Sequence, residues 1–181
     1  MTNEERSLVC SRLESSLLSL QQVTEDLSAT QWCFKPSETS WSASQCAEHL
    51  AEVENSVNNR IQIILNEGFS DPKLCAEAEG KEGLLGRAVP SRTRLANAPK
   101  QPDNNPVYAT QVQALAILSE IRAGTLQFAQ TTEAALEKHV FPHFLFGQLN
   151  LYQWLFLLSL HSERHTAQIQ EIKANPEFPK A

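Results

Sequence analysis

LNLYQWLFLLSLHSERHTAQIQEIK, residues 149–173, decides the fold. The first half of this stretch is apolar on nearly all sides, and its second half carries His161 and His165 four positions apart. On an α-helix, positions i and i+4 lie on one face about one turn apart, so both imidazoles can reach a single metal ion. The stretch therefore predicts a long helix, residues 149–174, with a metal-site pattern in its second half. The alternative is that both histidines lie on a solvated face, where the helix becomes polar.

Two further helices are predicted upstream. Thr2 and Ser42 each begin a capping-box pattern, with Glu or Gln three positions later, and apolar residues then recur at helical spacing. These signals predict helices over residues 3–29 and 43–66. Pro36 and a Ser/Thr cluster separate the two helices.

Residues 66–108 hold four of the six glycines and five of the nine prolines, so no long helix fits there. A helix over 109–138 follows, with Gly124 as a weak point near its middle. Long connections have a purpose in compact domains, and a crossover between the second and third helices would let them run parallel. The segment can also form a pocket wall. Four amphipathic helices without a convincing strand predict an all-α four-helix bundle.

The composition predicts one domain spanning residues 1–181. The chain is 41% hydrophobic, enough for one substantial core, and its formal charge of −6 comes without a basic run. Nucleic acid is therefore not an expected partner. We also expect no membrane span, because the longest apolar stretch, 155–160, is far shorter than a bilayer requires. A polar, acidic N-terminus without a signal-peptide pattern favours a cytoplasmic location.

The other histidines have more ordinary interpretations. His49 borders the apolar seam of the 43–66 helix, and a lone histidine there is most often a satisfied core or rim residue. His139 and His143 also stand four apart, but Pro142 between them makes a continuous helical turn doubtful. A capping or turn role is expected for that pair.

Two segments resemble a known family. WSASQCAEHLAEVE, residues 41–54, resembles the WSxxQxxEHL segment of the DinB-like (damage-inducible B) four-helix proteins. HFLFGQLNLYQWLFLLSLHSERHTAQI, residues 143–169, resembles their more specific HPxFGxLxxYQWLxFxxxHxxRHxxQI segment. Phe144 and Gln148 depart from that pattern at positions where the family often has proline, which affects the expected loop conformation.

The resemblance implies a bundle with up-down-down-up helix order and a three-histidine metal site. By matching positions, the metal ligands would be His49, His161 and His165. Three imidazoles leave at least one coordination position of a divalent ion open, which is the arrangement of catalytic rather than closed structural zinc. Zn²⁺ and Ni²⁺ both suit imidazole.

The expected function is that of a small metalloenzyme acting on an unidentified small molecule. The ion would lower the pKa of bound water, or would bind a substrate thiol as its thiolate. The resemblance implies either a metal-dependent hydrolase or a transferase that uses a low-molecular-weight thiol. Two alternatives stay open: a non-catalytic stress-associated or binding protein with a structural ion or none, and an obligate homodimer.

Four side chains are candidates for the surroundings of the site. Cys46, one turn before His49, is either a fourth ligand or a packing residue. Glu52 and Gln168 either orient an imidazole or lie on the solvated surface. Arg164 either neutralises an anionic substrate or forms an ion pair within its helix. Trp41 is expected to pack in the core.

Overall fold

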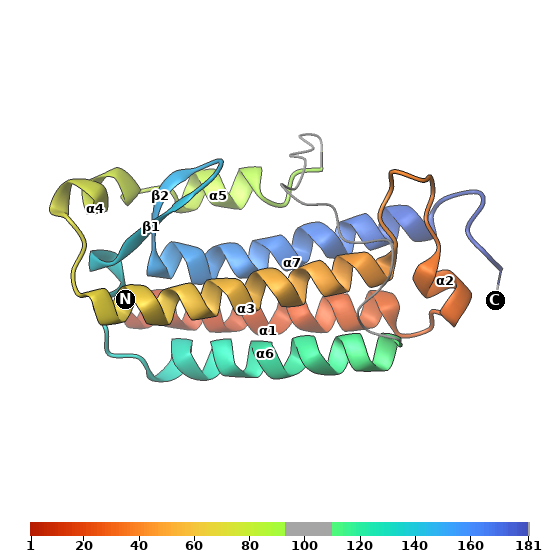
Figure 1. Ribbon diagram of the computed structural model, residues 1–181, viewed down its shortest axis with the longest axis horizontal. Coiled ribbons are helices and arrows are strands. Elements are labelled where there is room, and N and C mark those ends of the chain that lie inside the picture. Colours follow the sequence, from red (N-terminus) through yellow and green to blue (C-terminus); the bar gives the residue numbers. More distant parts are fainter. Residues whose placement is uncertain (93–109, 181) are drawn as a thin grey trace.

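The computed structural model describes residues 1–92 and 110–180 and confirms the four-helix bundle. Its long helices are α1 (Asn3–Thr24), α3 (Ala43–Glu67), α6 (Gln111–Thr131) and α7 (Leu151–Lys173). Figure 1 shows α1 and α7 running in one direction and α3 and α6 in the other, which is the up-down-down-up order. Helix α7 packs against α1 and α3, and α6 packs against the same two helices from the other side.

Side-chain caps mark where all four long helices begin, and Thr110 caps α6. The Thr2 and Ser42 hydroxyls accept hydrogen bonds from the backbone N–H groups of Glu5 and Gln45, at 3.1 and 3.2 Å. Asn150 caps α7 in the same way. Each cap satisfies backbone donors that the first helical turn leaves unpaired. The predicted start of the 43–66 helix is therefore correct.

The first predicted helix is too long. Helix α1 ends at Thr24, and a short helix, α2 (Ala29–Cys33), follows a turn. Ser28 caps α2 through the backbone N–H of Gln31. Leu27 continues the apolar periodicity of the helix although it lies in the turn. The turn folds Leu27 into the core, where it is 9% exposed, so the periodicity predicted too long a helix.

The third predicted helix also runs too far, since α6 ends at Thr131 and not near residue 138. A 3₁₀ turn, η1 (Leu136–Lys138), comes next. The sequence then forms an antiparallel hairpin of β1 (Val140–His143) and β2 (Gly147–Asn150), where no strand was predicted. Gly147 has a φ of +65°, which only glycine adopts without strain.

The connection between α3 and α6 contains two short helices in its described part, α4 (Pro72–Ala78) and α5 (Glu82–Ala88). Both pack inward through a fully buried side chain, Ala78 from α4 and Leu85 from α5. Figure 1 shows α4 and α5 lying along the bundle, in the direction that a crossover requires. Residues 93–108 of the predicted crossover lie outside the described residues.

The core consists of two apolar clusters with a polar layer between them. One cluster surrounds the N-terminal half of α7, and the other surrounds the start of α3. Between them, Arg122 of α6 donates two hydrogen bonds of 2.7 Å to the Glu54 carboxylate of α3. The same guanidinium donates to Ser16 of α1 and Ser162 of α7, at 3.1 and 2.9 Å. All four long helices therefore meet at one buried charge pair.

None of the helices in the described ranges is both long and apolar enough to span a bilayer. The four cysteines form no disulfide bond.

Candidate metal centre

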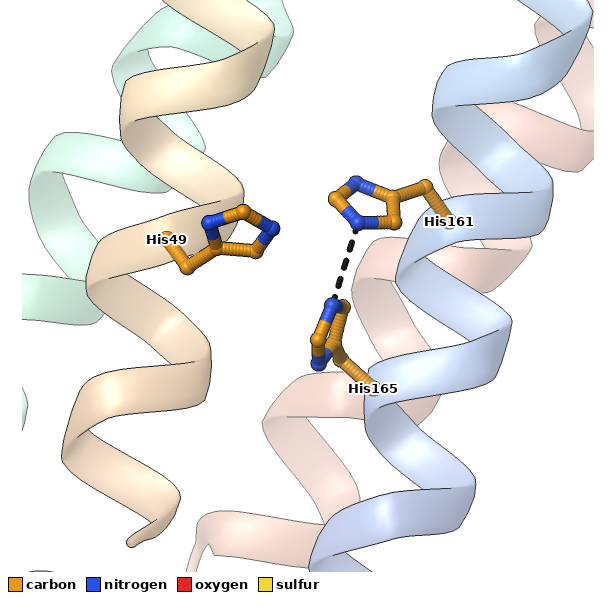
Figure 2. Close-up of side chains that lie close together, drawn as sticks. All are labelled: His49, His161 and His165. Atoms are coloured by element: carbon orange, nitrogen blue, oxygen red, sulfur yellow. Dashed lines mark hydrogen bonds between the residues drawn. The ribbon is translucent and has the colours of Figure 1, made fainter. Parts of the chain in front are cut away.

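Three histidines from two antiparallel helices converge at the face where α3 meets α7. His49 projects from α3, and His161 and His165 project from consecutive turns of α7 (Figure 2). One ring nitrogen from each histidine lies within 4.8 Å of the others. Among the described residues, this is the only group of three or more histidine, cysteine or acidic side chains placed to share an ion.

The ring orientations suit a shared ion. The Nε2 atoms of His161 and His165 lie 3.0 Å apart and point toward each other. Two nitrogens bound to one tetrahedral zinc ion at 2.0–2.1 Å would be separated by about 3.3 Å, close to this distance. The His49 ring meets both others edge to face, with centroids 5.0 Å from His161 and 5.1 Å from His165. The three residues therefore fit a divalent transition metal.

Burial keeps these imidazoles neutral. It lowers the pKa of His49 to about 4, and it lowers the pKa of His161 to about 3 with help from the neighbouring His49 and Arg164. Burial likewise brings the pKa of His165 well below its ordinary value, and the adjacent imidazoles add to the effect. A neutral imidazole offers the lone pair that a metal requires, so the site needs no deprotonation at neutral pH.

Trp41 is the aromatic neighbour of this cluster. Its indole stacks on the His165 ring at 5.5 Å between centroids, with 8° between the planes. It also meets the His49 ring edge to face at 4.9 Å. The sequence suggested core packing for Trp41, and the structure places it against two of the three candidate ligands.

Two predicted neighbours do not join the cluster. Cys46 is completely buried in the apolar cluster around the start of α3, and burial raises the pKa of its thiol to about 12. Cys46 is not part of the group whose ligand atoms lie within 4.8 Å of one another, so packing is the role the structure supports. Glu52 is exposed and lines a surface hollow with Asn55 and Asn59, and it is not part of the group that could share an ion.

Arg164 and Gln168 hold a neighbouring segment. Arg164 donates to the backbone carbonyls of Val89 and Ser91, in the segment that follows α5. Arg92 of that segment donates in return to Gln168 at 3.3 Å and to Glu171 at 2.9 Å. Residues 89–92 are therefore fastened to the same half of α7 that carries the histidines. The pocket wall suggested by the sequence stays a prediction.

His139 and His143 lie outside the cluster. His139 ends the 3₁₀ turn and is 4% exposed, and His143 ends β1. The Nδ1 atom of His143 accepts a hydrogen bond from the Leu145 backbone N–H at 3.1 Å. This contact within the hairpin agrees with the predicted turn role.

The polar layer beside the site was not predicted from the sequence. Glu54 and Arg122 are 2% and 1% exposed, and Ser162, which accepts from Arg122, follows His161 directly. A signal was present: Glu54 lies four positions after Leu50 and three before Val57, so it falls on the buried stripe of its helix. A charged residue on such a stripe indicates a buried partner on another helix.

Bundles that carry metal commonly bind it between facing helices, with two ligands from one helix and others from its neighbour. This chain is a four-helix bundle in which three histidines from two facing helices lie close enough to share an ion. It belongs to the DinB superfamily, whose family model matches residues 12–169. The predicted family is thus confirmed.

Two relatives extend the comparison. The chain is 27% identical over 140 residues to YuaE, an uncharacterized protein of Bacillus subtilis (strain 168), and the match covers 77% of this chain and 81% of YuaE. Its structure is similar to that of YfiT from Bacillus subtilis, with a TM-score of 0.63 and 17% identity. That match covers 99% of this chain and 91% of YfiT. YfiT is described as a probable metal-dependent hydrolase with an unusual four-helix bundle topology.

Proposed function

We propose that this protein is a metal-dependent hydrolase whose divalent ion is held by His49, His161 and His165. The convergence of three neutral imidazoles within 4.8 Å is the observation that carries the proposal. The description of YfiT as a probable metal-dependent hydrolase supports it, since the two chains share a fold. Zn²⁺ and Ni²⁺ are the proposed metals, because both accept imidazole ligands.

The chemistry follows from the donor set. A divalent ion held by three imidazoles would act as a Lewis acid. It would lower the pKa of a bound water molecule or thiol toward neutral pH. The protein contributes a fixed arrangement of ligands: α7 supplies two imidazoles from one face, and α3 supplies the third across the bundle. The Arg122–Glu54 pair ties both helices together beside the site. The proposed substrate is a small molecule.

Metal uptake tests the ligand set. Protein purified without added metal is analysed for its elements, and His161→Ala is expected to lose stoichiometric metal while keeping its helical circular dichroism. His143→Ala is the matched control, because that histidine lies outside the cluster. Unchanged metal content in the His161 variant would refute the proposal, as would a wild-type protein that takes up no Zn²⁺ or Ni²⁺.

Enzyme assays distinguish a hydrolase from a thiol transferase and from a non-catalytic protein. A hydrolase cleaves ester or amide substrates without a cosubstrate, whereas a transferase consumes a low-molecular-weight thiol together with an electrophile. Zinc-loaded and nickel-loaded protein is therefore assayed with and without thiol. If metal removal lowers the melting temperature but both assays stay silent, the ion is structural and the non-catalytic alternative holds.

A further inference from the structure

The His165 ring lacks the contact that usually orients a metal-binding histidine. Such a histidine normally donates its second ring N–H to a carboxylate, a carbonyl or water, which fixes the ring. Within the described part of the chain, the Nδ1 atom of His165 is buried and has no hydrogen-bond partner. Its Nε2 atom is the one that faces His161. No protein group in the described residues therefore orients this ring through its Nδ1 atom.

Trp41 supplies a contact of the right kind. The two ring planes are nearly parallel, 8° apart, with centroids separated by 5.5 Å. A flat contact of this type restricts rotation of the imidazole about its bond to Cβ. The same indole meets His49 at 75°, so one side chain touches candidate ligands from both helices.

Trp41 is itself firmly placed. It directly precedes Ser42, which begins α3 and forms a reciprocal capping box with Gln45. The Ser42 and Gln45 side chains are 3% and 5% exposed, so this cap is built into the core. Trp41 also packs against the apolar cluster around the start of α3. The indole is thus held at the start of α3, the same helix that carries His49.

We propose that Trp41 is a positioning residue of the metal centre, whose flat face orients the His165 ring. This inference rests on the proposed function, because it presumes an ion in the three-histidine cluster. An imidazole that binds a cation acquires positive charge, and an indole face attracts positive charge. The contact therefore favours the metal-bound form over the metal-free form.

Zinc affinity tests the proposal without any assay of activity. The Zn²⁺ dissociation constant is measured by competition with a chromophoric chelator for wild-type, Trp41→Leu and Trp41→Phe proteins. Loss of the ring in Trp41→Leu is expected to weaken binding about 10–100-fold, as for other residues that orient metal ligands. Trp41→Phe keeps an aromatic face and is expected to restore most of the affinity.

Trp32→Leu is the matched control. Trp32 belongs to the same apolar cluster and is 3% exposed, but none of its ring contacts within the described residues is to a histidine. Its replacement is expected to lower the melting temperature and leave the Zn²⁺ dissociation constant unchanged. Equal affinity of Trp41→Leu and wild type would overturn the proposal. Equal losses in Trp41→Leu and Trp32→Leu would also overturn it.

A nuclear magnetic resonance measurement on the metal-free wild-type protein covers the case in which Trp41→Leu does not fold. Stacking on an indole shifts the ring protons of His165 upfield, and Trp41→Phe should reduce the shift. Ring protons at their ordinary positions would exclude the stacking and with it the proposal. If wild-type protein binds no Zn²⁺, the proposed function fails, and this spectrum still reports separately on the ring contact.

Discussion

At the scale of single residues, the buried ion pair between Arg122 and Glu54 in the middle of the bundle is the most sensitive point for stability. Arg122 and Glu54 are 1% and 2% exposed. Further hydrogen bonds with Ser16, Ser162, Thr125 and the Leu13 carbonyl satisfy the remaining polar groups of the pair. Removing one member of a buried ion pair leaves the other charge without compensation, which costs far more than the loss of an exposed pair.

Arg122→Met is therefore expected to lower the free energy of unfolding by about 3–5 kcal/mol. Urea denaturation measures the change. Glu163→Gln is the control, because its ion pair with Arg12 is one-third exposed and should contribute at most about 1 kcal/mol. Similar losses in the two variants would contradict the assignment of Arg122 as a central stabilising residue.

We expect the free energy of unfolding of the metal-free protein to decrease in acid, because its histidines are buried. An unfolded imidazole titrates near 6.5, whereas the pKa of His161 is lowered to about 3 and that of His49 to about 4 in the fold. As pH falls through this window, the unfolded chain binds protons that the folded protein does not, so the folded state loses stability. At pH values above the window, both states are neutral and the effect vanishes.

Thermal unfolding of chelator-treated protein at about pH 7.5 and about pH 5 measures this effect. The decrease in melting temperature should be smaller in His161→Gln than in wild type, because the variant lacks one of the displaced titrations. An equal decrease in both proteins would show that other groups control the acid response.

At the scale of elements, the segment 89–92 depends on α7 for its position. Arg164 donates to two of its backbone carbonyls, and Arg92 donates to Gln168 and Glu171. Arg164→Gln is expected to free the segment and accelerate tryptic cleavage after Arg92, as followed by mass spectrometry. Glu163→Gln, one position away on α7, should not change that rate. Equal rates in the two variants would show that Arg164 does not hold the segment.

The helices could be predicted from the sequence where caps and periodicity agreed. Helix α3 was correct to one residue, since Ser42 marks its start and an unbroken seam continues to its end. The ends of α1 and α6 were placed too late, because Leu27 and Leu136 continue an apolar pattern while lying in a turn and a 3₁₀ turn. Periodicity reports burial, and buried residues outside helices imitate it.

The hairpin and the polar layer needed tertiary information. Pro142 and Gly147 indicated a connection, and both lie beside the hairpin turn. The pairing of β1 with β2 also involves α7, because the Trp154 indole N–H donates to the Phe141 carbonyl of β1. The i,i+4 spacing indicated His161 and His165, whereas His49 entered the site only through the resemblance. Trp41 gave no local signal, because its contact with His165 joins distant parts of the sequence.

For the whole molecule, a bound ion should stabilise the fold through the two helices that it joins. A ligand that binds only the folded state at 100 times its dissociation constant adds about 2.7 kcal/mol. Zn²⁺ is therefore expected to raise the melting temperature of wild-type protein but not of His161→Ala. Mg²⁺, which prefers oxygen ligands, is the control ion. A rise in the His161 variant would show that Zn²⁺ binds elsewhere.

The obligate homodimer suggested as an alternative stays a prediction about the whole molecule. Sedimentation of the full chain at several concentrations measures the assembly directly, and a single species at the monomer mass would exclude it.

The order of the helices along the chain has a consequence for biosynthesis. During translation, α1, α3 and α6 leave the ribosome before α7, which packs against two of them and brings two of the three imidazoles. A nascent chain that ends before α7 contains only one of the three candidate ligands, His49. An ion bound by the cluster would therefore find its full set of ligands only after α7 has been synthesised.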